Sequence, residues 1–348
     1  MSFRLALTEQ DRARVRAPGS ARRLTALLAL SGLLVLLCGL SVAIGVRQVA
    51  LADVIAALNG QTETIAEAAV AARLPRTLLA ALAGAGLGLA GAVMQGITRN
   101  PLADPGILGV NTGAALAVVI AVAWFNIATA QAYIWSAILG AAVAAVFVYA
   151  IASLGRGGAT PLKLALSGTA TSIALSSLVI AIVLPRSDIA GGLQAWQIGS
   201  VGGATMARIM PVVPFLALGF AICLLSAKRL NSLALGDELA AGLGESVAFA
   251  RASAALGAIL LCGGVTAVCG PIGFVGLVVP HLCRQLVGID HRWLLPFSAL
   301  GGAVLVIGAD VAGRVLARPG EISVGVLVAL IGAPFFIWIA RRHKVRAI

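Results

Sequence analysis

The sequence predicts an all-α membrane protein, a polytopic bundle of about ten transmembrane helices. The first observation is the composition: 60% of the residues are hydrophobic and only 11% are charged, whereas a soluble domain has roughly 25% charged residues. The second is that the apolar residues gather in runs close to the ~20 residues with which a helix crosses a bilayer. The third is the 41 glycines, because glycine lets membrane helices approach closely.

Ten apolar runs give the expected spans, which form a single transmembrane domain over 24–340 between basic tails at 1–23 and 341–348. The first run is longer than the roughly 7 to 15 apolar residues of a signal peptide, so we expect an uncleaved span. The third, eighth and ninth are short or interrupted by Gly and Pro, which predicts that they lie inside the bundle. The expected spans are 24–46, 77–97, 106–125, 131–153, 162–184, 208–227, 248–268, 271–287, 293–309 and 322–340.

The distribution of basic residues predicts the orientation. Of the 25 Lys and Arg residues, 18 fall on the side of the N-terminus and 7 on the other side. Cytoplasmic segments carry the excess of positive charge in membrane proteins, so we expect both termini in the cytoplasm. The net charge of +12 then reflects topology and contact with membrane lipid. It predicts no nucleic-acid partner, because the basic residues flank apolar runs instead of forming one basic face.

The sequence lacks the residue patterns with which a chain hydrolyses ATP or holds a metal. A P-loop needs Gly-x-x-x-x-Gly-Lys-Ser/Thr, and no lysine lies in that pattern. The five cysteines show no metal-ligand spacing, and His281 has no second histidine close to it. We therefore expect no enzyme, no cofactor and no metal site. A structural motif is expected at Pro280, His281 and Arg284.

The 13 acidic residues bear on a different class of transporter. An ion-coupled carrier places acids or a proton relay in mid-membrane. Glu9 and Asp11 lie in the N-terminal tail and the other 11 acids, Asp104 included, on the inner or outer side, so none of the 13 is predicted in mid-membrane. This pattern disfavours ion coupling, although an ion-coupled secondary transporter with a sodium site made of backbone carbonyls stays open as the alternative.

Two connections are longer than a tight turn. The outer one, 47–76, is mildly apolar and helix-like and is expected to lie over the bundle. The inner one, 228–245, carries charges of both signs and predicts two short amphipathic helices broken at Gly236 and Gly242. It is a candidate docking surface for a soluble partner. A plain connector between the sixth and seventh spans is the alternative.

The outer face is poor in positive charge, which makes its arginines candidates for recognition. Arg73 and Arg76 precede the second span, and Arg314 follows the ninth. Arginine suits bidentate binding of carboxylates across an interface. Contact with lipid headgroups, or a local pair such as Asp310 with Arg314, is the alternative.

These arginines belong to a series of motif-like stretches along the chain. The stretches are Arg73-Leu74-Pro75-Arg76, Gly91 to Gly96, Arg99-Asn100-Pro101-Leu102-Ala103-Asp104-Pro105-Gly106 to Gly109, Gly270 to His281 with Arg284, Ala309-Asp310 with Arg314, and Gly332 to Phe336. In these stretches the sequence resembles the FecCD-like permease family of iron-siderophore, haem and vitamin B12 ABC importers. The likeness covers nearly the whole chain after the N-terminal tail, and ordered agreement over that length is more specific than a single short motif.

The resemblance implies the architecture of a type II ABC importer at a bacterial cytoplasmic (inner) membrane. Its expected partners are two cytoplasmic ABC ATPase subunits, an extracytoplasmic substrate-binding protein, and a second permease copy or a paralogue. It implies inward transport of a ferric siderophore by alternating access, with haem or vitamin B12 as alternatives. The outer arginines Arg73, Arg76 and Arg314 are then expected to receive acidic residues of the binding protein.

The resemblance also implies roles at the inner side. Coupling helices at about 230–245 are expected to carry ATPase motion into the bundle, and a cytoplasmic gate is expected at two loops. By position, the gate residues are Asn100, Thr160 and Pro161. The coupling residues are Leu235, Gly236, Asp237, Glu238, Ala241, Leu243 and Gly244.

Overall fold

The computed structural model describes residues 19–46, 49–101, 103–106, 109–125, 127, 129–154 and 161–342. In these ranges the chain forms helices and no strand, so the predicted all-α class is confirmed. Thr160 and the tails over 1–18 and 343–348 lie outside the described residues. The helices are α2 (Ser20–Ala43), α3 (Leu51–Leu58), α4 (Ile65–Thr98), α5 (Val110–Phe125), α6 (Ala130–Ser153), α7 (Pro161–Val183), α8 (Ser187–Gln197), α9 (Met206–Ile209), α10 (Val213–Leu225), α11 (Ala227–Leu233), α12 (Asp237–Gly242), α13 (Val247–Cys269), α14 (Val275–Val287), α15 (His291–Leu316) and α16 (Val324–Arg342).

The described helices provide one segment for each expected span. Six helices are long and apolar enough to cross a membrane, and a seventh span results if α10 and α11, which meet at a bend of 48°, are counted together. Shorter apolar helices occur at Val110–Phe125, Val275–Val287 and Val324–Ile337. The polytopic helix bundle is therefore confirmed.

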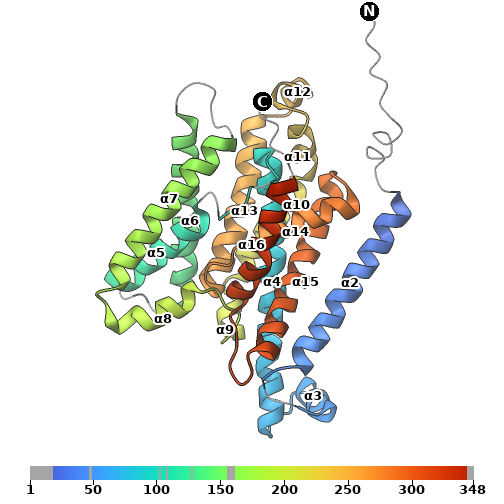
Figure 1. The fold of residues 1–348 in the computed structure, drawn as a ribbon, viewed down its shortest axis with the longest axis vertical. Helices are drawn as coiled ribbons and strands as arrows, with labels where there is room; N and C mark the ends of the chain where they lie inside the picture. Colours follow the sequence, from blue (N-terminus) through green and yellow to red (C-terminus); the bar gives the residue numbers. More distant parts are fainter. Residues whose placement is uncertain are drawn as a thin grey trace, which may run out of the picture.

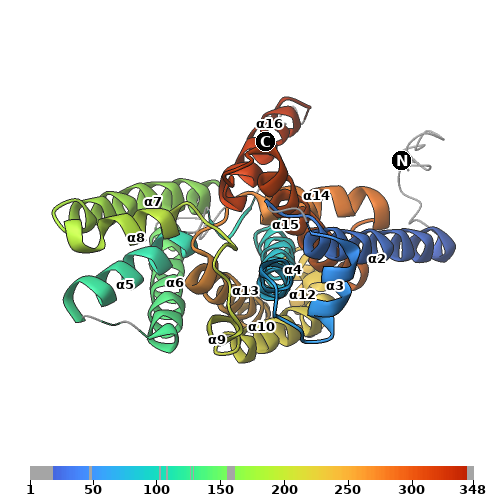
Figure 2. The ribbon, with the colours of Figure 1, turned by 90° about the horizontal axis from the view of Figure 1, so that it is seen from below.

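Helix α4 lies at the centre of the bundle, among α10, α13, α14 and α15 (Figures 1 and 2). Its glycines bring backbone against backbone without side chains between them. A Cβ atom added at Gly84 would lie 2.2 Å from the carbonyl oxygen of Gly302 in α15, and one at Gly91 would lie 2.1 Å from that of Gly276 in α14. Close backbone contact of this kind is what a glycine-rich membrane sequence predicts.

Helix α4 is longer than the second expected span, because it begins at Ile65 and not near residue 77. Thr64 and Glu67 form a capping box: the Thr64 hydroxyl accepts from the N–H of Glu67 at 3.1 Å, and the Glu67 carboxylate accepts from the N–H of Thr64 at 3.0 Å. The outer connection is thus α3 followed by the first turns of α4. Arg73 and Arg76 consequently lie inside a helix instead of before one.

Helices α5, α6, α7 and α8 form a second group beside the central one (Figure 2). Helix α2 lies at the opposite edge, and only 6% of its most apolar stretch is buried, against 78% for α4. Helix α16 packs on α14 and α15 and projects from the side of the bundle (Figure 2). These edge helices offer apolar surface to lipid or to further chains.

The connection between α4 and α5 corrects the predicted position of Asp104. It turns back into the bundle, so that a Cβ atom added at Gly276 in α14 would lie 2.8 Å from Asp104 Oδ2. Gly276 itself packs against Gly91, well inside α4. The carboxyl therefore lies within the bundle and not at the membrane edge. Its Oδ1 accepts from the N–H of Gly106 at 2.7 Å, which satisfies non-helical backbone among protein atoms.

The three spans expected to lie inside the bundle are α5, α14 and α15, and each buries side chains against its neighbours. Helices α5 and α14 have 16 and 13 residues. Helix α15, the ninth span, runs for 26 residues and continues through Pro296. A proline removes one helical hydrogen bond, and α15 packs on α4 and α14 along its length.

The two ends of the bundle differ in what they carry. Helix α2 begins and α16 ends where α12 lies, which we call the α12 end (Figure 1). Helix α3 and the first turns of α4 lie at the opposite end, which we call the α3 end (Figure 1). Both ends hold candidate functional residues.

Candidate functional site

A compact ionic cluster lies at the α3 end. Arg76 donates to Asp310 through Nε at 3.0 Å and through a terminal nitrogen at 2.8 Å, and it pairs with Glu321 at 2.8 Å. Arg314 pairs with the other oxygen of Asp310 at 2.7 Å. The side chains of Arg314 and Asp310 are only 2% and 1% exposed. Two guanidinium groups thus hold one buried carboxylate between α4 and α15.

Arg314, together with Arg73, also holds the end of α2. Arg314 donates to the carbonyl oxygens of Ser41 at 2.8 Å and Ile44 at 3.0 Å. Arg73 donates to those of Val42 and Ala43 at 3.0 Å and 2.9 Å. The last carbonyls of a helix have no partner in the helix and attract cations. Arginine side chains therefore join α2 to the central bundle at this end.

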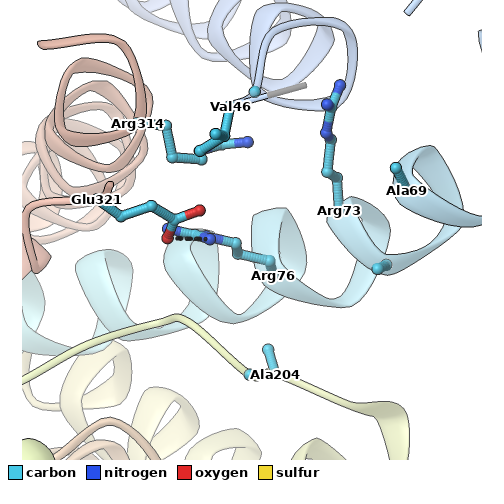
Figure 3. A pocket seen from close by; sticks show the side chains of 10 residues that line it. Val46, Ala69, Arg73, Arg76, Ala204, Arg314 and Glu321 are labelled. Atoms are coloured by element: carbon cyan, nitrogen blue, oxygen red, sulfur yellow. Dashed lines mark hydrogen bonds and ion pairs between the residues drawn. The ribbon is translucent and has the colours of Figure 1, made fainter. Parts of the chain in front are cut away.

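A pocket of about 290 Å³ opens beside this cluster. Figure 3 shows Arg76, Arg314 and Glu321 turned toward one another, with Arg73 beside them. The lining residues are Gly45, Val46, Ala69, Ala72, Arg73, Arg76, Gly203, Ala204, Arg314 and Glu321.

The three arginines predicted from the sequence, Arg73, Arg76 and Arg314, therefore come together around one pocket. The local pair of Asp310 with Arg314, which the sequence offered as the alternative, is present. Their role in docking a binding protein stays a prediction. The guanidinium groups have partners within the chain, so a docking partner would meet a cluster that is already charge-paired.

At the α12 end, the segment over 228–245 forms the short helices that the sequence predicts. Helix α11 ends at Leu233, and α12 begins after Gly236 and ends at Gly242. Three leucines of this segment are highly exposed, in contrast to the buried Leu230 and Leu233 of α11. The exposed leucines are Leu235 at 57%, Leu239 at 63% and Leu243 at 68%.

Helix α11 is fixed to the start of α15. The Asn231 amide donates to Asp290 at 2.7 Å, and its oxygen accepts from the N–H of His291 at 2.9 Å. Burial raises the pKa of Asp290, but hydrogen bonds from Asn231 and the N–H of Arg292, together with the Arg292 charge, outweigh it and hold that pKa below its ordinary value. Asp290 is therefore an ionised cap of α15.

Helix α12 is attached differently, through the first of its residues. The carboxylate of Asp237 pairs with Arg99, the residue that ends α4, and with Arg251 in α13 at 2.9 Å. The side chains of Arg99 and Asp237 are 39% and 45% exposed. Glu238, Ala241 and Gly244 are exposed as well. Sequence reasoning found these positions but not the partners of Asp237.

The predicted gate residues lie at two places. Asn100 follows Arg99, the C-terminal cap of α4, and its N–H donates to the carbonyl oxygen of Gln95 at 3.2 Å. Pro161 is the first residue of α7, and Thr160 lies outside the described residues. A gate function for these positions stays a prediction.

The motif of Pro280, His281 and Arg284 lies in α14. Arg284 donates to the Gln95 side chain in α4 at 2.5 Å, and Gln95 donates to the carbonyl oxygen of Gly276 at 3.0 Å. The His281 ring meets that of Phe335 edge-on at 5.9 Å between ring centres. These contacts join α4, α14 and α16. Among the described residues, no group of three or more His, Cys, Asp or Glu side chains is placed to hold a metal ion.

Two residues that matter here were missed from the sequence. Leu239 of α12 lies four residues before the exposed Leu243, a spacing that was a readable signal. Ser41 was not readable, because its contact with Arg314 joins residues 273 positions apart.

Residues 33–342 match the model of the FecCD transport family. The ferric enterobactin transport system permease protein FepD of Escherichia coli (strain K12) is 43% identical over 324 residues, which cover 91% of this chain and 96% of FepD. The hemin transport system permease protein HmuU of Yersinia pestis is 40% identical over 281 residues, covering 78% and 82% of the two chains. A solved structure of a metal-chelate type ABC transporter, in an inward-facing conformation, superposes with a TM-score of 0.78 at 31% identity, covering 92% of this chain and 99% of that one.

Proposed function

The chain belongs to the FecCD transport family, and from this premise we propose that it is the permease subunit of an ABC importer that brings a ferric siderophore or a related iron chelate into the cytoplasm. The observation that carries the proposal is a family match that extends over residues 33–342. Because the sequence has no P-loop, the energy comes from separate ATPase subunits. No bond of the cargo is broken by this chain, which acts as a conduit and not as an enzyme.

The proposed contact with the ATPase is α12. The exposed Leu239 and the exposed Leu243 that caps α12 lie four residues apart, Leu235 is exposed before the turn at Gly236, and Glu238 is exposed beside them. An amphipathic helix of this kind docks into an apolar groove of a partner. Leu239→Asp should therefore prevent co-purification of the ATPase while the permease itself stays folded. A complex that survives this change would contradict the assignment.

The proposed cycle is alternating access. ATP binding in two cytoplasmic ATPase subunits moves α12, and the bundle then opens toward the α3 end, which faces outward in this proposal. Asn100, Thr160 and Pro161 form the inner gate. The distribution of Lys and Arg supports the orientation, because 18 of 25 fall on the side assigned to the cytoplasm, with both termini there.

A second permease copy or a paralogue completes the translocation path in this proposal. Helices α7 and α16 each carry exposed apolar side chains, among them Leu178 and Ile180 in α7 and Leu330 and Ile331 in α16. In this proposal, lipid covers the exposed apolar side chains that do not contact the second permease.

The proposed cargo is inferred from the names of the relatives. Their names include ferric enterobactin, iron(3+)-hydroxamate and Fe(3+)-citrate as well as hemin. Three of these four names contain iron(3+) or ferric iron in a chelate, which supports a ferric siderophore or a related chelate as the cargo of this chain, and haem or vitamin B12 is the alternative. The experiment is uptake into liposomes that hold this chain with the ATPase and the substrate-binding protein encoded next to its gene. Ferric enterobactin, ferric citrate, hemin and cobalamin are offered in parallel, with and without ATP.

We expect uptake of a ferric siderophore that requires ATP and the binding protein. Uptake into liposomes that hold this chain alone, driven by a sodium or proton gradient, would favour the ion-coupled secondary transporter instead. Asp104, the carboxyl inside the bundle, is the residue such a carrier would use. Asp104→Asn is thus informative: the importer keeps its dependence on ATP in this variant.

The α3-end cluster is the proposed landing site of the binding protein. Carboxylates of that protein would meet Arg73, Arg76 and Arg314, and such an association weakens as salt rises. Because Arg314 is 2% exposed, reversing its charge would disturb the fold. Arg76→Gln is the better variant, with the exposed Arg208→Gln of α9 as the matched control. Equal affinity of both variants for the binding protein would remove the docking role.

A further inference from the structure

Two glycines bound helix α12, and each has a backbone conformation that other residues rarely adopt. Gly236 has φ of 111° and Gly244 has φ of 85°. Glycine adopts these values without steric cost, whereas other residues do so rarely. Between these glycines the helix has a single residue that is fully buried, Ala240. Helix α12 is thus a short piece between two turns that require glycine.

The neighbouring helix α11 has the opposite character. Leu230 and Leu233 are fully buried, and Asn231 is bonded to both Asp290 and His291 at the start of α15. Any displacement of α12 relative to the bundle therefore occurs after α11, at Gly236.

One carboxylate joins α12 to the rest of the bundle. Oδ1 of Asp237 pairs with Arg251 at 2.9 Å and also with Arg99. These arginines come from two different helices, since Arg99 ends α4 and Arg251 lies in the first turns of α13. Because one oxygen binds two guanidinium groups, a displacement of Asp237 acts on both arginines.

Arg99 ends α4 in a backbone conformation that is more usual for glycine than for arginine. Its φ is 52° and its ψ is 30°, in the left-handed region. Glycine, or asparagine, ends helices in this conformation with less strain than arginine. What arginine adds is a side chain that reaches Asp237, at the residue where the connection from α4 to α5 begins.

That connection leads from the α12 end to the middle of the bundle. Asn100 follows Arg99, and Asp104 lies beside Gly276 in the first turn of α14. Its Oδ1 is bonded to the N–H of Gly106 at 2.7 Å. The connection is therefore held at its beginning by Asp237 and further along by its contact with α14.

We propose that Arg99, Asp237 and Arg251 form a transmission link, in which Asp237 passes the displacement of α12 to the connection between α4 and α5 and so to the interior of the bundle. The link rests on the proposed function, because it gives the route by which ATPase motion reaches the predicted gate at Asn100. Arg99 and Asp237 are positioning residues that touch no cargo. The neighbouring pair of Arg229 with Glu245, at 3.3 Å, serves as the comparison, because it involves no residue of that connection.

The first test uses the chain alone in lipid nanodiscs and needs no cargo. Hydrogen exchange of the backbone amides at 99–106 is compared between the unchanged chain, Asp237→Asn and Glu245→Gln. We expect exchange in this stretch to rise about fivefold in Asp237→Asn, the ratio that loss of one exposed ion pair allows. Glu245→Gln should leave it unchanged. Equal exchange in Asp237→Asn and the unchanged chain, or an equal rise in both variants, would overturn the link.

The second test uses the assembled importer and two variants of Arg99. Arg99→Asp should lower uptake of a ferric siderophore about tenfold, a coupling effect of ordinary size, while ATP hydrolysis continues. Arg99→Lys keeps the positive charge that faces Asp237 and should retain at least half of the uptake. Uptake in Arg99→Lys no better than in Arg99→Asp would overturn the link.

The two tests separate the link from the proposed function. If the unchanged importer takes up no iron chelate, the proposed function fails, while hydrogen exchange still decides the link. If uptake is normal in the unchanged importer and in Arg99→Asp, the link alone fails.

Discussion

The two ends of the bundle use the same kinds of charged residue in opposite ways. At the α3 end, Asp310 and Arg314 are 1% and 2% exposed and are held together with Arg76 across two helices. At the α12 end, Arg99 and Asp237 are 39% and 45% exposed, and they join the end of α4 to a short helix between two glycines of positive φ. The pair of Asp310 with Arg314 is buried, whereas the pair of Arg99 with Asp237 lies on the surface.

This difference in exposure indicates that an ion pair marks a rigid part of the structure only where it is buried. A buried pair is costly to break, because the remaining partner keeps a charge away from water. An exposed pair contributes little to stability and can open and re-form. We infer that the α3 end fixes α2, α4 and α15 to one another, whereas the α12 end is built to move.

The largest effect is therefore expected from Asp310→Ala. This change leaves Arg76 and Arg314 without their shared carboxylate, and the free energy of unfolding should fall by about 3–5 kcal/mol. Unfolding in mixed detergent micelles measures it. Glu321→Ala is the matched control: it also removes a partner of Arg76, but its side chain is 40% exposed, so a loss of at most about 1 kcal/mol is expected. Similar losses in both variants would contradict the difference in burial between these carboxylates.

The span pattern could be predicted from the sequence because hydropathy is a local property. Every expected span has its helix, and the capping box at Thr64 and Glu67 was a readable start for α4. The position of Asp104 was not readable. Its place depends on Gly91 and Gly276 meeting without side chains between them, and this contact joins segments far apart in the chain.

The site was predicted in part for the same reason. The pair of Asp310 and Arg314 lies four residues apart and could be read directly. The pair of Arg76 and Asp310 spans 234 positions, and no periodicity reports such a contact. The coupling segment was found because its mixed charges and glycines differ from the apolar runs around it, but the partners of Asp237 come from two other helices.

A smaller effect is expected at the entry to α12. Gly236 has φ of 111° and ψ of 155°, a region that only glycine adopts freely, and another residue there costs about 1–3 kcal/mol. Gly236→Val should displace α12 and abolish the stimulation of ATP hydrolysis by cargo while the chain still inserts into the membrane. Gly242→Ala is the control, since nothing lies within 4 Å of a Cβ atom at Gly242. Stimulation that survives in Gly236→Val would argue against α12 as the moving part.

The smallest effect needs no substitution, because salt acts on the two clusters unequally. Raising ionic strength from about 0.1 M to 1 M shortens the screening length from about 10 Å to about 3 Å, and exposed charges feel this far more than buried ones. Amide exchange in α12 should therefore increase by a factor of about two to three, since the pairs of Asp237 contribute at most about 1 kcal/mol. Exchange near Arg314 and the end of α2 should stay constant, because protein atoms exclude salt from that cluster. Equal responses at both ends would mean that burial does not distinguish the clusters, and α12 would then be as firmly fixed as α2.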